Sequence, residues 1–438
     1  MARDDDPATF YHANATPLRF DPPETVSVAT PVCVIGGGLA GLHVARALAF
    51  ARIPVVLLEA QRVGHGASGR NGGFVSPGYA LSMRDIEEQV GLEQAKELYD
   101  LSVEGFETVK SDLRHFGLRR LVHGEGYLTV QRHADVDELR WHAEHMNETY
   151  GTEKEFLRRE QVYGYLRTLS YHAGLLDPAP FHIDPYYYTR VLARDARDAG
   201  VDIYEQTPVF SITRQDWKWR IDTIRGEVMA EQVVLAGSAY QRGVFRALDR
   251  AVIPVSTHVV TTAPLSSRER DAIRFNGCIA DTRRASDYYR LVPSPEGRRL
   301  LWGGRISTFK PSPNSLAKRM HGDLTSVFPQ LQSVAIDHAW TGLMAYTRTK
   351  MPLVGPLDDG VWACTGFGGH GLNTTAACAH LVAGAVVYGD DRWRLFEPFQ
   401  TRWGGGLLGK AGAQIAYWKM QFDDRVRERR PAPINDEK

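Results

Sequence analysis

Hydrophobic runs and helix-period patterns alternate in the first part of the chain. Residues 31–59 read as a short apolar run, a glycine cluster, a helical pattern and a second apolar run, which predicts a β–α–β unit. Residues 64–78 then form a glycine-rich loop that is too long and too rich in small residues for a simple connector. From Leu81 to Gly117 apolar residues recur at helical spacing, with a break near Gly91, so we expect amphipathic helices at one edge of a sheet.

The alternation of strand and helix returns near the middle and the end of the chain. A helix is expected over residues 184–199, with an Asp-Pro pair at its start and a strand directly after it. Residues 233–239 form another apolar strand, and residues 361–384 repeat the order of strand, glycine turn and helix. One α/β domain is therefore predicted, built from three separated pieces of sequence.

The sequence between these pieces has a different pattern. A strand is expected over residues 127–131 and a helix over residues 135–150. Residues 242–332 contain short alternating strands, such as 288–292, but no glycine fingerprint. This pattern predicts a second, antiparallel sheet.

Composition places the chain among ordinary globular proteins. Of its 438 residues 43% are hydrophobic and 24% are charged, and the length suits two or three domains. The 52 Lys and Arg residues balance the 52 Asp and Glu residues, so no global field attracts nucleic acid or an anionic membrane, and small molecules are the expected partners. The four cysteines never form a C-x-x-C pair, so neither a disulfide framework nor a metal site is expected.

The ends of the chain predict no segment that crosses a membrane. The start lacks a secretory signal, and no apolar run reaches about 18 residues, so we expect a cytoplasmic protein. For residues 401–422 a packed terminal helix is favoured over a helix that lies on a lipid surface. The charged, proline-containing tail 423–438 is expected to be disordered.

The glycine cluster between the first strand and the first helix carries the main chemical signal. Gly36 permits a tight turn, Gly38 lets the backbone approach a pyrophosphate, and Gly41 permits close packing of the helix on the strand. The start of the helix offers amides and a positive dipole end to phosphates. Glu59, at the end of the second strand, would accept hydrogen bonds from a ribose diol. This pattern predicts a dinucleotide site but does not separate FAD from NAD.

Two later glycine-rich segments favour a flavin. Residues 68–74 form a loop of small residues whose amides could lie flat against a wide heterocycle. Residues 366–374 lead into a helix whose N-terminus could stabilise the negative charge of a reduced flavin. An NAD-dependent dehydrogenase stays open as an alternative, and it predicts a colourless protein.

These motifs occur in the order seen in the D-amino-acid oxidase superfamily of flavoproteins, which the chain resembles from about residue 11 to residue 420. The segments that carry the resemblance are GGGLAGL with Glu59, VGHGASGRNGGF, YEQTPV, VVLAGSAY, WTGLMAYTRTKMPLVG and GFGGHGLN. The chain looks most like the γ-glutamylputrescine oxidase branch. The expected architecture is α/β, and α+β overall: a Rossmann-like FAD-binding domain interleaved with a β-rich antiparallel substrate domain. The FAD-binding domain would comprise residues 26–100, 176–240 and 333–400, and the substrate domain residues 101–175 and 241–332.

The resemblance also implies which residues hold FAD. The ADP part would contact Gly36, Gly38, Leu39, Ala40, Gly41, Glu59, Ala60, Gln61 and Arg62. The ribityl chain and the flavin ring would lie along Ser68, Arg70, Asn71, Gly72 and Gly73. Val209 would contact the adenine, and Ala236 and Gly237 the pyrophosphate, although strand packing explains Val209 and Ala236 equally well. Gly369, Gly371, Leu372, Asn373 and Thr374 would face the pyrimidine edge.

The resemblance implies that FAD is bound non-covalently. Some relatives tether the flavin through a Cys where this chain has Met344. Others use a His where this chain has Arg70.

The candidate catalytic residues each have a structural alternative. Amine oxidation by a flavin needs alignment and dry surroundings more than a strong base. His370 could tune the flavin or hold the amine, or it could cap a turn. Tyr288 or Tyr289 could supply an aromatic wall and Arg305 a cation, or either tyrosine could lie in the core and Arg305 in a surface ion pair. Tyr346 is a further candidate.

We therefore expect an FAD-dependent oxidoreductase that converts the C–N bond of an amine or amino acid to an imine, with O₂ as acceptor. The first alternative is a D-amino-acid or imino-acid dehydrogenase that passes electrons to a quinone or another carrier. Sarcosine-oxidase-like relatives place a Lys near the flavin to assist oxygen, and the matching LLWGGR strand has no clear Lys. The alternative from another class is a non-catalytic flavin-binding partner protein.

Overall fold

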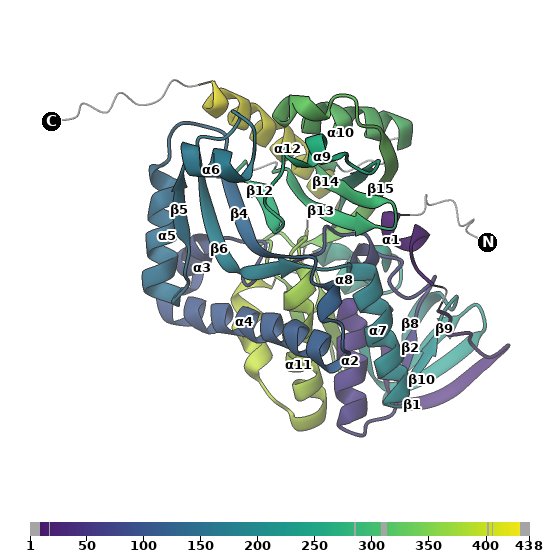
Figure 1. Cartoon of the computed structure of the whole chain (residues 1–438). Coiled ribbons are helices and arrows are strands. Elements are labelled where there is room, and N and C mark those ends of the chain that lie inside the picture. The colour runs from purple at the N-terminus through teal and green to yellow at the C-terminus, as the bar shows by residue number, and fades with distance from the viewer. Residues whose placement is uncertain are drawn as a thin grey trace.

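The chain builds two sheets of different construction (Figure 1). The computed structural model describes residues 9–16, 18–283, 286–307, 313–400, 403–404 and 406–429. The first sheet is mainly parallel and the second is mainly antiparallel, as the sequence predicts. The predicted fold class is therefore confirmed.

The first sheet has the strand order β16-β17-β10-β1-β2-β7, with a β8–β9 hairpin attached to β10. Its strands are β1 (Val26–Ile35), β2 (Val55–Leu58), β7 (Asp202–Tyr204), β8 (Val209–Gln215), β9 (Lys218–Thr223), β10 (Gly226–Leu235), β16 (Leu353–Asp358) and β17 (Val361–Thr365). β1 pairs in parallel with β2 and β10, so the segment between β1 and β2 is the predicted β–α–β unit. The central strands are buried on both faces and consist largely of Val, Ile and Leu, as parallel strands require.

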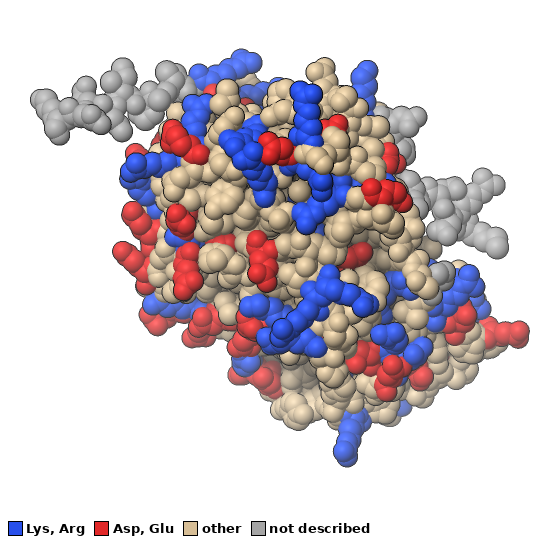
Figure 2. Space-filling view, viewed as in Figure 1, with Lys and Arg blue, Asp and Glu red and all other residues tan. Residues whose placement is uncertain are grey.

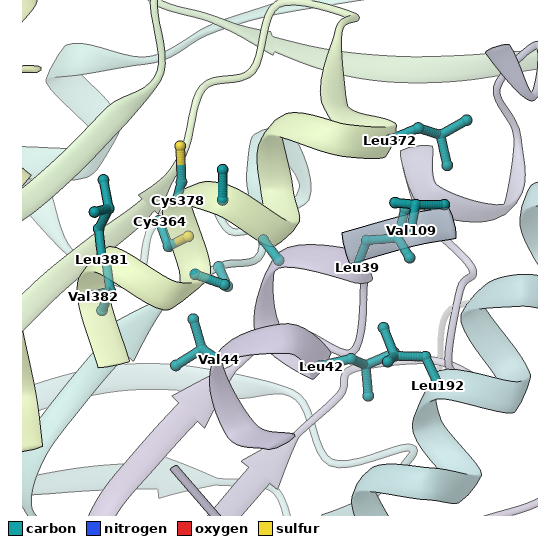
Figure 3. Packing of buried hydrophobic residues seen from close by; sticks show 14 of the residues in the cluster. Leu39, Leu42, Val44, Val109, Leu192, Cys364, Leu372, Cys378, Leu381 and Val382 are labelled. Carbon is teal, nitrogen blue, oxygen red and sulfur yellow. The ribbon is translucent and has the colours of Figure 1, made fainter. Parts of the chain in front are cut away.

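Two long helices, α2 (Leu39–Phe50) and α11 (Gly371–Tyr388), contact this sheet, and two more, α4 (Leu92–His115) and α7 (Pro185–Asp198), pack against them. A short α3 (Met83–Val90) precedes α4, and Gly91, with a positive φ of 81°, separates the two at the predicted break. α2 contacts both α7 and α11, and α11 also contacts α4. Figure 3 shows the resulting core, to which α2 contributes Leu39 and Leu42, α4 Val109, α7 Leu192 and α11 Cys378 and Val382.

The second sheet has the order β15-β11-β14-β13-β12-β4-β6-β3, with β5 paired to β6. Its strands are β3 (Phe74–Val75), β4 (Gly124–Gln131), β5 (Glu155–Arg158), β6 (Ala173–His182), β11 (Ile253–Thr262), β12 (Cys278–Asp281), β13 (Tyr288–Ser294), β14 (Gly297–Ser307) and β15 (Ile336–Tyr346). The pair β12–β4 is parallel, which departs from the purely antiparallel prediction. Trp302 of β14 and Met320 of α10 (Pro313–Val327) belong to a second hydrophobic core.

Shorter helices complete the described chain. They are α1 (Phe10–Ala13), α5 (Asp137–Tyr150), α6 (Arg159–Tyr165), α8 (Arg246–Ala251) and α9 (Ser267–Arg270). The long helix α12 (Gly406–Glu428) lies at the C-terminal end of the described chain. In Figure 1 α10 and α12 lie above the second sheet, on the side away from α2 and α11.

Membership of the two sheets does not follow the predicted domain segments. β3, most of β6 and β15 belong to the second sheet, although they fall within the segments 26–100, 176–240 and 333–400 predicted for the FAD-binding domain. α4 crosses the predicted limit at residue 100 and contacts α11. Membership of a sheet depends on pairing partners far away in the chain, which local patterns do not reveal. The division into an FAD-binding and a substrate domain stays a prediction.

The C-terminal helix is longer than predicted. α12 continues to Glu428, six residues into the tail that the sequence predicts to be disordered. Glu428 contacts Arg132 at 3.2 Å, so packing holds a segment whose composition alone indicated disorder. Residues 430–438 of the predicted tail lie outside the described residues.

Candidate functional site

A cavity of about 460 Å³ is lined by residues of both sheets and of the loops at their ends. Its wall includes the predicted cofactor residues Gly36, Gly38, Leu39, Ala40, Glu59, Ala60, Gln61, Ser68, Arg70, Asn71, Gly72, Gly73, Ala236, Gly237, Gly369, Gly371, Leu372 and Asn373. These residues come from five segments, 36–40, 59–61, 68–73, 236–237 and 369–373. The fold therefore brings the three glycine-rich motifs together around one space.

The turn after β1 is shaped by backbone contacts that only glycine permits. Gly36 has a φ of +115°, and a Cβ atom there would lie 2.7 Å from Gly237 Cα. A Cβ atom on Gly41 would lie 2.0 Å from the Gly36 carbonyl oxygen. The Ser68 hydroxyl accepts a hydrogen bond from the Leu39 amide at 2.9 Å, at the start of α2. The tight turn and the close helix packing predicted for Gly36 and Gly41 are thus present.

Glu59 is held at the edge of the same turn. Its carboxylate accepts hydrogen bonds from the Gly37 amide at 2.7 Å and from the Gln61 amide at 2.8 Å. Burial raises the pKa of Glu59, and the two amides oppose that change. The side chain lines the cavity beside the start of α2, which is where a ribose-binding carboxylate is required.

The loop of residues 70–73 turns four consecutive carbonyl groups toward hydrogen-bond donors from elsewhere in the chain. In order along the loop, they accept from Trp340 Nε1 (2.9 Å), the Tyr11 hydroxyl (2.9 Å), Arg290 Nε and the Ile183 amide (2.9 Å). Each peptide group is planar, so the N–H of the following residue points the opposite way. The amides of Asn71 and Gly72 therefore point away from these donors, and both residues line the cavity.

A buried cation, Arg290, organises this loop. Its side chain is fully buried and donates to the Gly72 and Ile183 carbonyls, to the Tyr11 oxygen and to His182 Nδ1 (2.7 Å). His182 Nε2 lies 2.7 Å from the Asn276 carbonyl, which can only accept, so this nitrogen carries the proton. His182 is thus neutral, and burial and the adjacent Arg290 hold its pKa well below the usual value.

His370 immediately precedes the first turn of α11 and lines the cavity. Its Nε2 donates to the Ser76 carbonyl at 3.0 Å, and burial lowers its pKa, so the ring is neutral. Asn373 in the next turn donates to the Ser102 carbonyl of α4 at 3.1 Å. These bonds fix the N-terminus of α11 at the cavity wall, where Gly371 and Leu372 also lie.

Aromatic side chains from the second sheet form another part of the wall. Phe74 makes edge-to-face contacts with Tyr127 and with Tyr288, each with ring centroids 5.7 Å apart. All three residues line the cavity, together with Thr257 and Met344. Burial raises the pKa of the Tyr288 hydroxyl, so this group stays protonated.

Comparison with known proteins now identifies the family. Residues 31–385 match the family model described as FAD dependent oxidoreductase, abbreviated DAO. The chain belongs to this family.

Named relatives of this DAO-family protein span nearly its whole length. It is 32% identical to the gamma-glutamylputrescine oxidoreductase of Escherichia coli over 381 residues, which cover 86% of this chain and 88% of that protein. It is 29% identical to the probable oxidoreductase OrdL of Haemophilus influenzae over 415 residues, covering 93% and 94% of the two chains. The structure of glycine oxidase from Bacillus cereus matches with a TM-score of 0.68 at 23% identity, covering 84% of this chain and 98% of that one, and shows the same fold. The resemblance stated from the sequence is confirmed.

Two of the predicted catalytic residues of this DAO-family chain lie away from the cavity. Tyr289 is fully buried in the second core, where its ring stacks on Trp302 at 4.4 Å. Successive residues of a strand point to opposite faces, so the neighbouring Tyr288 faces the cavity instead. Arg305 forms a two-pronged ion pair with Asp323, which is the structural alternative for this residue.

Other predicted residues are also absent from the described cavity wall, namely Gly41, Arg62, Val209, Thr374 and Tyr346. Gly41 packs against the Gly36 carbonyl, and Arg62 pairs with Glu205 at 2.8 Å. Val209 pairs with Thr223 in the β8–β9 hairpin, the strand-packing alternative.

Sequence reasoning missed several wall residues, including His65, Tyr127, Tyr240 and Thr257, and it missed Tyr11 behind the wall. They lie outside the glycine motifs, and only strand pairing and packing bring them to the site. For Tyr127 the alternation of its strand was a usable signal, because Leu128 and Val130 are fully buried on the other face.

Neither a membrane helix nor a metal cluster appears among the residues that the structure describes. None of those helices has a stretch apolar and long enough to cross a bilayer. Across the same residues, no group of three or more His, Cys, Asp or Glu side chains is arranged to hold a metal ion.

Proposed function

We propose that this protein oxidises the C–N bond of an amine or amino acid to an imine, which water hydrolyses, and that O₂ accepts the electrons. The observation that carries the proposal is the shared cavity. Three glycine-rich backbone segments line one part of it, and Phe74, Tyr127 and Tyr288 line another.

The residues at the first part of the cavity fit FAD. The tight turn at Gly36, which lies against the Gly237 backbone, requires a residue without a Cβ atom, and Glu59 lies beside the start of α2. The amides of Asn71 and Gly72 and the N-terminus of α11 supply further donors for the flavin ring. When bound, FAD accepts the hydride equivalent from the carbon that bears the nitrogen.

The cavity wall supports non-covalent binding of the cofactor. Met344 lines the cavity where some relatives have a tethering Cys, and none of the four cysteines is among the wall residues. Precipitation of the purified protein with acid is expected to release all of the yellow colour into the supernatant. Colour that stays with the pellet would contradict this expectation.

The aromatic wall supports an amine substrate. Aromatic faces attract an ammonium group, and the low dielectric of a buried cavity favours its deprotonation to the reactive neutral amine. The neutral His370 lies at the wall without adding a charge. Arg70 supplies a guanidinium group to the described wall. Its Nε donates to the His65 carbonyl at 2.6 Å, so a main-chain contact partly sets its position. These features favour an amine over an α-amino acid, whose carboxylate needs a cation.

The first compounds to test are N-acylated diamines and polyamines. The name of the E. coli relative indicates γ-glutamylputrescine, an N-acylated diamine, as the substrate of that protein. We extend this compound class to the present chain as part of the proposal.

The deciding experiment is an anaerobic titration of the purified yellow protein with N-acylated diamines, polyamines, N-methyl amino acids and D-amino acids. We expect at least one amine to bleach the flavin absorbance, and admission of air to restore it with release of hydrogen peroxide. If an amine bleaches the protein but only an artificial acceptor restores it, the dehydrogenase alternative is correct. If no donor bleaches a protein that holds FAD, the non-catalytic alternative is correct.

A further inference from the structure

The C-terminal helix α12 is attached to the second sheet through one face only. Gln414, Tyr417 and Asp424 are buried on that face, and the helix contacts β11 and β14. Near its end, Glu428 lies 3.2 Å from Arg132 of the loop after β4 and 3.9 Å from Arg283. The carboxylates of the last turns are thus directed toward the protein, and the orientation of the helix is fixed.

The opposite face of α12 presents large apolar side chains to solvent. Ile415 is 62% exposed, Trp418 57%, Phe422 65% and Val426 38%. At about 100° per residue these four positions fall within an arc of about 80°, so they form one continuous stripe along the helix. We call this set the α12 stripe.

The charges exposed beside the stripe are basic. Lys419 and Arg425 are exposed and lie about 20° from the two edges of the stripe. Arg427 and Arg429 are exposed at the end of the helix, whereas the acidic residues of the described helix are partly or fully buried. Figure 2 shows Lys and Arg side chains at the upper edge of the molecule, where α12 lies in Figure 1. The chain carries no net charge, so this local excess of positive charge belongs to the helix face and not to the whole protein.

A Trp- and Phe-containing stripe flanked by Lys and Arg has the chemistry of a helix that lies in the headgroup region of an anionic bilayer. A second copy of the chain fits this face poorly, because a two-fold contact would bring each set of basic residues against its own equivalent. The segment that follows the helix, residues 430–438, has one large apolar residue, Ile434, and so has too little apolar surface to cover the stripe.

We propose that the α12 stripe docks this protein on an anionic lipid surface. The apolar side chains enter the boundary between headgroups and acyl chains, and Lys419 and Arg425 on the two flanks of the stripe face the anionic headgroups. Each basic residue near such a surface contributes about fivefold to binding, so these two residues make binding dependent on lipid charge and on salt.

The test is co-sedimentation of the full-length flavoprotein with vesicles of phosphatidylcholine, either pure or with about 30% phosphatidylserine. We expect binding to the anionic vesicles, weaker binding to the neutral ones, and a loss of binding as salt rises. The double variant Trp418→Ser/Phe422→Ser should lose at least about tenfold in vesicle affinity. The variant Lys419→Gln/Arg425→Gln should lose the preference for phosphatidylserine.

A matched control uses two equally exposed aromatic residues at the far end of the molecule. Trp217 is 64% exposed and Phe210 57% exposed, both in the β8–β9 region. The variant Trp217→Ser/Phe210→Ser should bind vesicles like the wild type, and all variants should keep the flavin spectrum. Wild-type protein that stays in the supernatant with both vesicles, or equal binding by the stripe and control variants, would overturn the proposal. So would a concentration-dependent dimer that the stripe variant abolishes, because a second copy would then cover the stripe.

Discussion

The two ends of the cavity are built in different ways. At the turn after β1 the conformation is set by contacts between backbone atoms: Gly36 lies against Gly237, and Gly41 lies against the Gly36 carbonyl. The loop of residues 70–73 is instead oriented by side chains from α1, β13 and β15, and the Arg290 contact joins residues 218 positions apart. Close backbone contacts can be predicted from the sequence because only glycine fits them, whereas long-range side-chain contacts have no such sequence signal.

The largest effect is expected at Gly41, in the part of the cavity that is set by backbone contacts. The Cβ atom of Gly41→Ala would lie 2.0 Å from the Gly36 carbonyl oxygen, and the backbone on both sides of this contact is packed. We expect a loss of at least about 3 kcal/mol in the free energy of unfolding and no retained FAD, measured by urea unfolding and by absorbance.

A glycine without neighbours provides the control for this prediction. A Cβ atom at Gly164 meets nothing within 4 Å, so Gly164→Ala in α6 should keep both stability and flavin. A yellow Gly41→Ala protein of wild-type stability would show that the turn is not fixed by this contact.

The second prediction concerns Arg290, which organises the side-chain end. Arg290→Met leaves the Gly72 and Ile183 carbonyls and His182 Nδ1 without this donor. Each buried acceptor left unpaired costs about 1 kcal/mol or more, so we expect a loss of about 3 kcal/mol in stability and a weaker FAD complex. Urea unfolding and the FAD dissociation constant measure the two effects.

The conservative variant separates charge from geometry at this position. Arg290→Lys keeps a cation but lacks the planar fork, so it should recover part of the stability and less of the FAD affinity. If Arg290→Met binds FAD as tightly as the wild type, the network supports the fold without orienting the loop.

These contrasts show how much of the fold and of the site can be predicted from the sequence. The fold class, the β–α–β unit and the convergence of three glycine motifs follow from local patterns, because strand, turn and helix signals lie within short segments. The sequence does not show whether Tyr288 or Tyr289 meets the cavity, because that depends on which strand face is turned inward, and a register shift of one residue reverses every side chain. The sequence likewise does not show that Arg305 pairs with Asp323, which lies on α10.

Acid sensitivity is the third prediction. His182 has a folded-state pKa well below its ordinary value of 6.5, through burial and the nearby Arg290, His123 and Arg298. Below about pH 6.5 the unfolded chain therefore binds a proton that the folded chain does not, and folding stability falls as pH falls. One such group changes the free energy of unfolding by up to about 1.4 kcal/mol per pH unit.

The variant His182→Gln isolates this contribution. Gln can accept from Arg290 and donate to the Asn276 carbonyl, but it does not titrate. Urea unfolding between pH 5 and about 7 should show a smaller slope in the variant, with a remainder from His123 and His258, whose pKa values burial lowers to about 3 and about 4. An unchanged slope would mean that His182 is already protonated in the folded protein.

The smallest expected effect belongs to one hydroxyl group. Tyr11→Phe removes the donor to the Asn71 carbonyl and an acceptor of Arg290 while leaving the ring in place against Trp340. We expect a loss of about 1 kcal/mol in stability and a measurable rise in the FAD dissociation constant. Burial raises the pKa of Tyr11 to about 12, so the difference from the wild type should stay constant between pH 7 and about 9.

Tyr79 offers a matched hydroxyl outside the loop. It is buried like Tyr11 and donates to a main-chain carbonyl, that of Leu98, at 2.7 Å. Tyr79→Phe should lose a similar amount of stability without changing FAD affinity or the flavin spectrum. Because the two variants remove the same chemical group, a difference between them in FAD affinity alone would show that the Tyr11 hydroxyl orients the loop. Equal FAD affinities would instead place the control of this loop with Arg290 and Trp340.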